Sequence, residues 1–439
     1  MKLYIIYIIF ILSFSKGIFV LLGIPDAIPQ LIIEFLILIL FIFSVQKIIK
    51  TKKITAPGLN ILILLTICIL FSFLFTKVSN LQFILFIRNS FIYLFFFYSL
   101  FNLNLSQKQK KKVITLLMFL FLAQIPAALI KLIVLGEPRE KIVGTVTVME
   151  GSLSTIMPLF PIVYLISRYL ENNKLKDLVL IVLFMGIGLI SDRLGILFYV
   201  IILFVGLSFL YAKPRYYIPN FKFLKITVLN SVYIVLFFIA FLSLNPRGNP
   251  EHIVGGSVDV NYLIDFTENY QTLDLQNGVE GDGRFDAPYV AFERLYEGGL
   301  KNIIFGFGPG EIIKSSLIEF DNPLLEIYNI GYGGRIGIVW IMMQIGILGL
   351  ILFLIFHIFL FNKIWYNYKN KETTQRIKIL SLTTMGFSLI FFLDIITYST
   401  EMILNPVVAL TYYFGIYYIL SSTNLIYVRN NNNYMPELY

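Results

Sequence analysis

Long apolar segments recur along almost the whole chain, and they limit the possible folds more than any other feature of the sequence. A run of about 20 apolar residues has the length of a helix that crosses the hydrocarbon core of a bilayer. Charged residues make up only 14% of the chain and the mean hydropathy is +0.81, whereas a soluble domain is about 25% charged. The sequence therefore predicts an all-α, polytopic membrane protein. The apolar segments are 3–22, 28–46, 57–76, 81–101, 113–135, 152–170, 177–191, 194–212, 223–244, 336–361, 378–399 and 402–421.

These segments predict about twelve transmembrane helices, with one large hydrophilic loop between the ninth and the tenth. Segments 177–191 and 194–212 are separated only by Asp192 and Arg193, which predicts a tight helical hairpin, with one long bent helix as the alternative. The predicted regions are 1–244 (helices one to nine), 245–335 (the loop), 336–421 (helices ten to twelve) and 422–439 (a cytoplasmic tail).

The distribution of basic residues predicts the orientation. If Met1 lies in the cytoplasm, the segments on its side of the membrane hold 22 Lys and Arg. The short segments on the other side hold four, namely Lys77, Arg139, Lys141 and Arg193. Short cytoplasmic loops carry such an excess of positive charge. We therefore predict that both termini are cytoplasmic and that 245–335 faces outward. Because the positive charge lies in short loops between apolar segments, the net charge of +9 does not indicate nucleic-acid binding.

The loop 245–335 has its own composition, with fourteen Asp and Glu against six Lys and Arg. After an irregular first part, Asp286 can cap a helix that has Pro288 in its first turn and ends at Gly298 and Gly299. One face of this helix is aromatic at spacings of three and four residues, which predicts packing on the outer membrane surface or on the ends of the spans. The residues of this face are Tyr289, Phe292 and Tyr296.

Five ionisable side chains fall within the outer halves of the predicted spans: Lys16, Glu34, Arg88, Lys131 and Asp394. We interpret the two lysines as snorkelling to the outer interface. A charge deeper in the bilayer faces the protein interior or a wet cavity. Arg88 can therefore pair with Glu34 or Asp394, or line a polar cavity that opens to the outer leaflet, and these interpretations are compatible. One cysteine and two histidines exclude a zinc site built from these residues, and we predict neither a metal nor another cofactor.

Four short motifs, in this order along the chain, carry a resemblance to a known family. They are Lys141-Ile142-Val143-Gly144-Thr145, Ser191-Asp192-Arg193-Leu194-Gly195, Asn302-Ile303-Ile304-Phe305-Gly306-Phe307-Gly308-Pro309-Gly310 (preceded by the helix that Arg284 leads) and Asp321-Asn322-Pro323-Leu324-Leu325-Glu326. With the twelve spans and the position of the loop, this pattern resembles the superfamily of O-antigen polymerases and O-antigen ligases. Two departures are that the usual Asn after the first motif is absent and that Asp321 stands where ligases of the family have His.

The resemblance implies a helical bundle like that of GT-C glycosyltransferases, in the bacterial cytoplasmic (inner) membrane. It implies a metal-independent glycosyltransferase that polymerises undecaprenyl-pyrophosphate-linked repeat units into O-antigen, capsular or exopolysaccharide at the outer face. The implied partners are these lipid-linked glycans, the bilayer, a flippase and a chain-length regulator. A ligase that transfers the glycan to another acceptor is the alternative within the family. A transporter or flippase of lipid-linked sugars is the alternative from another class, although transporters keep their charges near the midplane and repeat in halves.

The residue roles follow from the chemistry of a pyrophosphate leaving group. Arginines bind phosphate through paired hydrogen bonds, so Arg284 and Arg193 are candidate catalytic residues. Asp321 is the candidate general base. The alternatives are an ion pair of Arg284 with Asp282 or Asp286, a helix-end anchor for Arg193 and an Asx turn at Asp321. The candidate substrate contacts are Arg88, Arg294, Asn322, Gly308 and Gly310.

Overall fold

A computed structural model shows how the apolar segments are arranged. It describes residues 1–134, 144–146, 151–191, 195–212, 249–251, 253, 255–259, 261–262, 264–265, 283–313, 328, 330, 336–370 and 374–430. Every regular element in these ranges is helical, and eight of the helices are long and apolar enough to cross a membrane. The chain is therefore a helical, multi-pass membrane protein, as the sequence predicted.

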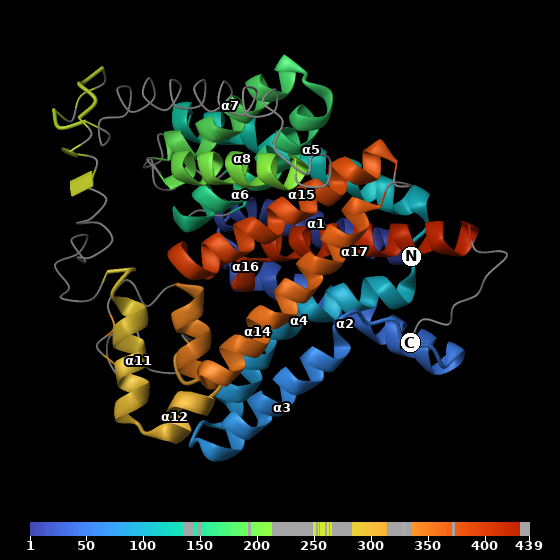
Figure 1. Ribbon diagram of the computed structural model, residues 1–439, viewed down its shortest axis with the longest axis vertical. Coiled ribbons are helices and arrows are strands. Elements are labelled where there is room, and N and C mark those ends of the chain that lie inside the picture. Colours follow the sequence, from blue (N-terminus) through green and yellow to red (C-terminus); the bar gives the residue numbers. More distant parts are fainter. Residues whose placement is uncertain are drawn as a thin grey trace.

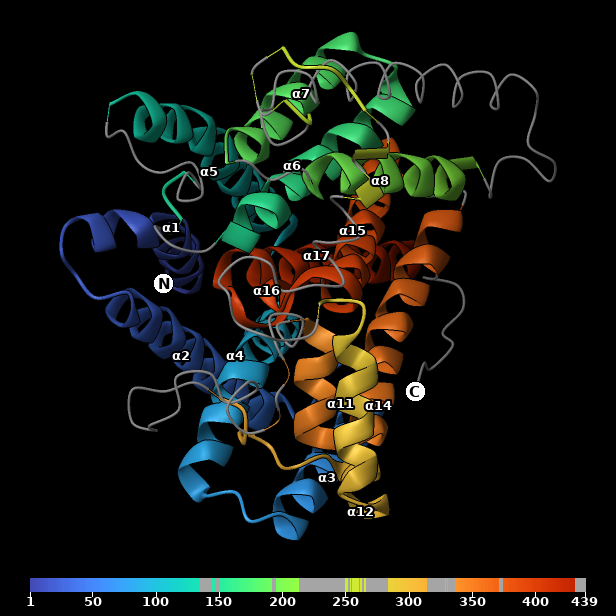
Figure 2. The same cartoon turned by 90° about the vertical axis from the view of Figure 1, so that its left-hand side faces the viewer.

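The described helices follow the predicted spans, and Figures 1 and 2 show their arrangement. They are α1 (Lys2–Leu21), α2 (Ala27–Thr51), α3 (Leu59–Phe75), α4 (Asn80–Leu103), α5 (Gln107–Ile133), α6 (Gly151–Asn172), α7 (Leu175–Ile190), α8 (Gly195–Ala212), α11 (Ala287–Glu297), α12 (Leu300–Phe305), α14 (Gly337–Lys369), α15 (Gln375–Leu393), the π-helix η4 (Asp394–Tyr398), α16 (Glu401–Leu404) and α17 (Pro406–Asn430). The predicted span 223–244 lies outside the described residues. The pair at 177–212 forms two separate helices, α7 and α8, which both pack against α6, so the alternative of one bent helix is wrong.

Helix α17 forms the centre of the bundle. It contacts α1, α4, α5, α6, α14 and α15, and in both views other helices surround it. Its large aromatic side chains Tyr412 and Tyr417 are fully buried. The Tyr417 hydroxyl accepts a hydrogen bond from the Leu105 backbone N–H at 2.8 Å, which satisfies its polar end. Aromatic side chains thus fill the interior, and the polar end of Tyr417 is satisfied by the backbone.

Figure 1 also separates two sides of the bundle. The N-terminus and the far end of α17 lie on the right, whereas α11 and α12 lie on the left. Helices α11 and α12 belong to the hydrophilic loop, so this described part of the loop and the chain's first residue lie on opposite sides. The relative arrangement agrees with the charge asymmetry, and the orientation in the cell stays a prediction.

Helix α11 forms where the sequence predicted a helix, but with a different buried face. Asp286 occupies its N-cap position without a capping hydrogen bond from its side chain, and Gly298 ends it. The buried residues are Ala287, Ala291 and Leu295, whereas Tyr289, Phe292 and Tyr296 are exposed. The predicted packing of the aromatic face on the ends of the spans is wrong, because the two alanines allow α11 to approach α14 closely.

Helix α14 is interrupted at Gly346, where φ is +71° and ψ is −176°. The interruption leaves the carbonyls of Met343 and Gln344 without partners inside the helix. The N–H groups of Phe307 and Gly308 donate to them at 2.8 and 3.2 Å. An unsatisfied backbone group at membrane depth costs several kcal/mol, so the glycine-rich turn seals the interruption.

The glycines of this turn are required by its close packing. Gly308 and Gly310 have φ of +128° and +102°, and a Cβ atom at Gly310 would lie 2.2 Å from the carbonyl oxygen of Gln82 at the start of α4. The Gly310 N–H donates to the Gln344 side-chain oxygen at 2.9 Å. From the other side, the Ser72 hydroxyl donates to the Phe305 carbonyl at 2.5 Å. The turn is therefore a packing element between α3, α4 and α14.

Candidate functional site

A second interruption, between α15 and α17, brings together several buried polar and ionisable side chains of the bundle interior. The chain passes from the π-helix η4 through Ser399 and Thr400 into the four-residue helix α16, and Asn405 then precedes α17. π-helical turns occur frequently at functional sites. Irregular backbone at membrane depth is tolerated where protein buries it or where it lines a cavity. The side chains around residues 394–405 are therefore candidates for a functional site.

Asp394 organises this segment from within. It is fully buried, and its carboxylate accepts hydrogen bonds from the Ser399 hydroxyl and from the Met402 N–H, the latter at 2.8 Å. The Ser399 hydroxyl also accepts from the Glu401 N–H at 3.3 Å. One carboxylate thus accepts hydrogen bonds from donors that have no partner in the interrupted helix. This explains why the chain has an acidic residue at this depth.

Arg284 approaches Asp394 from the loop. It lies just before α11 and is only 5% exposed. Its guanidinium carbon is 4.5 Å from the centre of the Tyr398 ring, and its charge acts on Asp394 and Tyr199. A cation over an aromatic face gains about 2 kcal/mol when both are desolvated. The ring and the buried carboxylate therefore fix a permanent positive charge at the junction of α11 and η4.

Two tyrosines connect this charge to α6 and α8. The Tyr398 hydroxyl shares a hydrogen bond of 2.8 Å with the Thr155 hydroxyl of α6. The Tyr199 hydroxyl of α8 is 3.0 Å from the Thr397 hydroxyl, and the Tyr199 and Tyr398 rings meet edge to face at 5.7 Å. The cluster therefore draws on α6, α8, η4 and the residue before α11. We call Arg284, Asp394, Tyr398, Tyr199, Thr155 and Glu401 the arginine cluster.

Glu401 brings a second carboxylate to the arginine cluster. It is half-buried at the start of α16, and its carboxylate accepts a hydrogen bond from the Ser152 hydroxyl near the start of α6. In contrast to Asp394, whose side chain is fully buried, Glu401 retains an exposed portion. It is therefore the carboxylate of the cluster that a ligand can approach.

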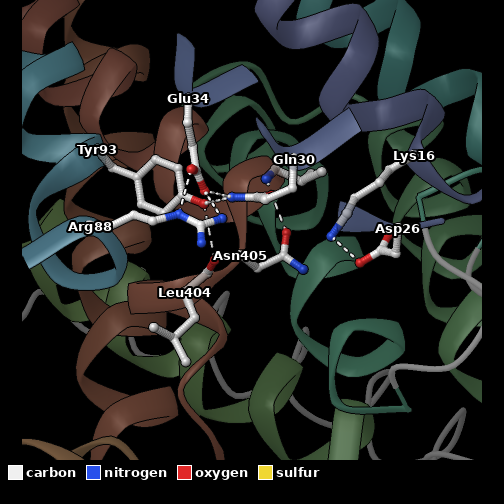
Figure 3. Close-up of polar contacts among 9 residues, drawn as sticks. Lys16, Asp26, Gln30, Glu34, Arg88, Tyr93, Leu404 and Asn405 are labelled. Atoms are coloured by element: carbon white, nitrogen blue, oxygen red, sulfur yellow. Dashed lines mark hydrogen bonds and ion pairs between the residues drawn. The ribbon is translucent and has the colours of Figure 1, made fainter. Parts of the chain in front are cut away.

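A separate ion pair lies on the other side of α16, and Figure 3 shows its geometry. Arg88 of α4 contacts the Glu34 carboxylate of α2 through two hydrogen bonds, Nε to Oε2 at 2.6 Å and Nη2 to Oε1 at 3.1 Å. The Gln30 amide donates to Glu34 at 2.7 Å, and the Tyr93 hydroxyl donates to the Leu404 carbonyl at 3.0 Å. The pair predicted for Arg88 is thus the one with Glu34, and its charges compensate each other.

The two lysines interpreted as snorkelling are instead buried in the protein. Lys16 is 8% exposed and pairs with Asp26 of the α1–α2 connection at 2.7 Å, as Figure 3 shows, and Lys131 is 4% exposed. The interpretation was wrong because protein surrounds both side chains.

Gly144 and Thr145 from the first motif join α1 to α5. The Thr145 carbonyl accepts a hydrogen bond from the Gly17 N–H at 2.8 Å, and the Thr145 N–H donates to the Gln124 side-chain oxygen at 2.8 Å.

The structure brings few of the predicted site residues together. Arg284 lies in the arginine cluster, but Arg294 lies within α11, seven residues or about 10 Å of helical rise beyond Ala287. There its guanidinium donates to the Tyr328 carbonyl at 3.1 Å and pairs with Glu297. The N–H groups of Gly308 and Gly310 bind Gln344 and seal α14, and the role of these glycines in substrate binding stays a prediction. The predicted residues Arg193, Asp321 and Asn322 lie outside the described residues.

Sequence reasoning missed Tyr199, Tyr398, Thr155 and Glu401. The two tyrosines are typical of apolar spans with many aromatic residues, and Glu401 falls between two predicted spans. A usable signal was the run Asp394 to Asn405, where three carboxylate or amide side chains and four hydroxyl side chains interrupt an apolar stretch just before Pro406. No model of a known protein family and no curated protein matches the chain.

Proposed function

We propose that the chain is a polysaccharide polymerase of the bacterial cytoplasmic membrane. It would have twelve spans in a bundle like that of GT-C glycosyltransferases, with the loop 245–335 outside. It would transfer a growing glycan from undecaprenyl pyrophosphate to the next lipid-linked repeat unit. The four ordered motifs and the spans support the family, and the arginine cluster supports the chemistry.

The buried guanidinium of Arg284 is the observation on which this proposal rests. It stands on the α11 side of the bundle, at an interrupted helix, over the Tyr398 ring and in the field of Asp394. In the transfer, the bond between the sugar C1 and the pyrophosphate oxygen breaks and the leaving oxygen gains negative charge. A fixed guanidinium stabilises that charge, and such preorganised stabilisation is usually the largest catalytic contribution.

The acceptor side of the reaction requires a base. As the new bond forms between C1 and an acceptor hydroxyl, the hydroxyl proton must pass to a carboxylate or similar group. Asp321 is the residue that the motif assigns to this step. Of the two carboxylates in the arginine cluster, Glu401 is the better candidate for the general base. It is half-buried, whereas Asp394 is fully buried, and it begins α16.

The experiment that separates the functions is deletion of the gene followed by analysis of the cell-surface glycan. A polymerase predicts surface glycan of a single repeat unit. A ligase predicts lipid-linked polymer without attached glycan, and a flippase predicts repeat units retained in the cytoplasmic leaflet. Purified protein with lipid-linked repeat units should also polymerise in excess chelator, and a strict requirement for a divalent ion would contradict the proposed arginine chemistry.

The outward position of the loop is tested independently of activity. In a Cys68→Ala background, which removes the natural cysteine, Asn370→Cys should resist an impermeant thiol reagent in intact cells. A cysteine introduced at Phe285, which is exposed at the start of α11, should react. The reverse pattern would place the arginine cluster on the cytoplasmic side and remove its access to an outer-leaflet substrate.

A further inference from the structure

An apolar groove lies between α5, α6, α15 and α17, helices that are labelled in Figure 1. Its interior is formed by buried aromatic and aliphatic side chains, among them Phe121, Phe160, Phe387 and Phe414. Five half-buried residues line it nearer the surface, which leaves it accessible from the lipid side. They are Ile114, Met118, Tyr164, Leu380 and Gly415.

The helices that form the groove carry cations at the same end. On α5, Lys110 precedes the lining residues Ile114 and Leu117 by four and seven positions, so all three share one helical face. On α15, Arg376 precedes the lining residue Leu380 by four positions in the same way. This end is the cytoplasmic one by the charge asymmetry of the sequence.

Lys110 is a buried cation whose partners are neutral. Its ammonium is fully buried, donates to the Ser421 and Ser422 hydroxyls at 2.9 and 3.3 Å, and lies 5.6 and 5.7 Å from the Tyr417 and Tyr418 ring centres. Throughout the part of the chain that the structure describes, no carboxylate pairs with it. A buried ammonium without a counter-ion is unfavourable, so an anion near this end would stabilise the protein.

Two further arginines lie at this end, and one of them is already neutralised. Arg168 packs over the Tyr164 ring and forms a buried ion pair with Asp177. Arg376 is exposed, its charge acts on Tyr418, and it has no ion pair within the described ranges. A hydrogen bond of 3.2 Å between the side chains of Gln375 and Asn172 holds the start of α15 beside the end of α6. Lys110 and Arg376 therefore remain as two uncompensated positive charges at one end of an apolar groove.

We propose that this groove binds one anionic phospholipid of the cytoplasmic leaflet. The acyl chain occupies the groove, the phosphate meets Arg376, and Lys110 contributes its charge from behind Tyr418. Basic pockets between transmembrane helices on the cytoplasmic side bind anionic headgroups in this way. A zwitterionic lipid brings its own cation and leaves the two charges uncompensated, so the groove selects for net negative charge.

The test uses the full chain in nanodiscs that contain equal amounts of phosphatidylglycerol and phosphatidylcholine, with retained lipid identified by native mass spectrometry. Wild type should retain one phosphatidylglycerol in preference to phosphatidylcholine. Arg376→Gln and Lys110→Met should each weaken that preference about fivefold, as expected for one cation near a membrane surface. Lys111→Met, an exposed lysine on the same helix, is the matched control and should leave the preference unchanged.

A second variant tests the groove without changing any charge. Met118→Trp places a larger ring at a half-buried lining position, and it should reduce retention of phosphatidylglycerol while both cations remain. Because Arg376 is exposed, Arg376→Gln keeps the test valid even where Lys110→Met disturbs folding. Equal retention of both lipids, an equal effect of Lys111→Met, or displacement of phosphatidylglycerol by an isoprenyl monophosphate would overturn the proposal. None of these outcomes depends on polymerase activity.

Discussion

The two interrupted helices of this bundle are closed in different ways. The interruption of α14 at Gly346 is sealed by backbone N–H groups of a glycine-rich turn, with Gln344 as the polar side chain that joins it. The interruption between α15 and α17 is closed by side chains, with Asp394 bound to Ser399 and Met402. Both satisfy backbone groups that lipid cannot satisfy. The difference is that the second places a fixed positive charge and two carboxylates in the protein interior.

This difference separates a structural motif from a chemical one. The glycine-rich turn is conspicuous in the sequence, and its short contacts with Gln82 and Gln344 show that it serves packing. The residues around Asp394 are inconspicuous in the sequence, and they hold Arg284 against Tyr398. Variants at the first interruption should therefore alter stability, and variants at the second should alter activity.

The largest expected effect is on stability, at Gly346. A Cβ atom there would lie 2.2 Å from the Ile304 carbonyl oxygen, and φ is +71°. A positive φ with an extended ψ is essentially restricted to glycine and costs another residue about 1–3 kcal/mol, and overpacking adds about 1–3 kcal/mol. Gly346→Ala should therefore lower the free energy of unfolding by about 2–6 kcal/mol, measured by thermal unfolding in detergent. Gly299→Ala is the matched control, since φ is +85° and nothing lies within 4 Å of its Cβ position. Equal losses in both variants would mean that contact with α12 is not what requires glycine.

The second effect is on activity, at Arg284. Arg284→Ala should reduce the rate of polymer formation by about 10²–10³, the usual consequence of removing one charge-stabilising donor. Arg284→Lys should recover little, because lysine keeps the charge but loses the planar fork. Rates with purified protein and lipid-linked repeat units measure this. Arg294→Ala, in the same helix but outside the arginine cluster, should stay within about tenfold of wild type by the same argument. Wild-type rates from Arg284→Ala would assign this arginine to structure alone.

Asp321 and Glu401 compete for the role of base, and a pair of amide variants separates them. If Asp321 accepts the proton, Asp321→Asn should slow polymer formation by about 10²-fold or more, the lower range for loss of a general base. Glu401→Gln should then have a much smaller effect. Asp321→His should retain some polymer and gain no ligase activity, because acceptor choice depends on the rest of the site. A large loss from Glu401→Gln together with wild-type chain lengths from Asp321→Asn would transfer the role to Glu401.

The eight membrane-length helices that the structure describes were predictable from the sequence, because lipid requires about 20 apolar residues for each crossing and the segments are long. The helix after Asp286 was also predictable, from Pro288 and the paired glycines that end it. Its buried face was not, because alanine carries no signal of burial that competes with Tyr289 or Phe292. Close approach to α14 is a property of tertiary packing.

The candidate site was only partly predictable. Arg284 and Asp394 stood out as charged residues, but their proximity depends on how α11 and η4 are placed. Tyr398 and Tyr199 are ordinary residues for an aromatic span, and their contacts join α6, α8 and η4, which are far apart in the sequence. The glycine motif stood out in the sequence, but its packing against α14 could not be predicted, since that contact depends on the interruption at Gly346.

A smaller effect is expected for the Arg88–Glu34 pair, which differs from the arginine cluster in that its charges are already compensated. Arg88→Met alone leaves the Glu34 carboxylate buried without its partner, and Arg88→Met with Glu34→Gln removes both charges. The loss in free energy of unfolding of the double variant should therefore be smaller than the summed losses of Arg88→Met and Glu34→Gln, by about 0.5–3 kcal/mol. Thermal unfolding of the four proteins measures this coupling. A stable double variant that loses polymer formation would show that Arg88 contacts substrate, as the sequence predicted.

The smallest effect concerns Glu311, directly after the turn that seals α14. Burial raises the pKa of its carboxyl, and its charge contributes to the raised pKa of Tyr328. Because the folded state binds the proton more tightly than the unfolded state, the wild type loses stability as pH rises through this pKa. Glu311→Gln cannot ionise, so its free energy of unfolding should exceed that of the wild type at pH 8. The difference should vanish below about pH 4, where the carboxyl is protonated in both states. Asp286→Asn, at an exposed carboxylate, controls for the change in net charge. If the wild type were instead the more stable protein at pH 8, the Glu311 carboxylate would be favourably bound where it lies, and the first interruption would also hold a charged site.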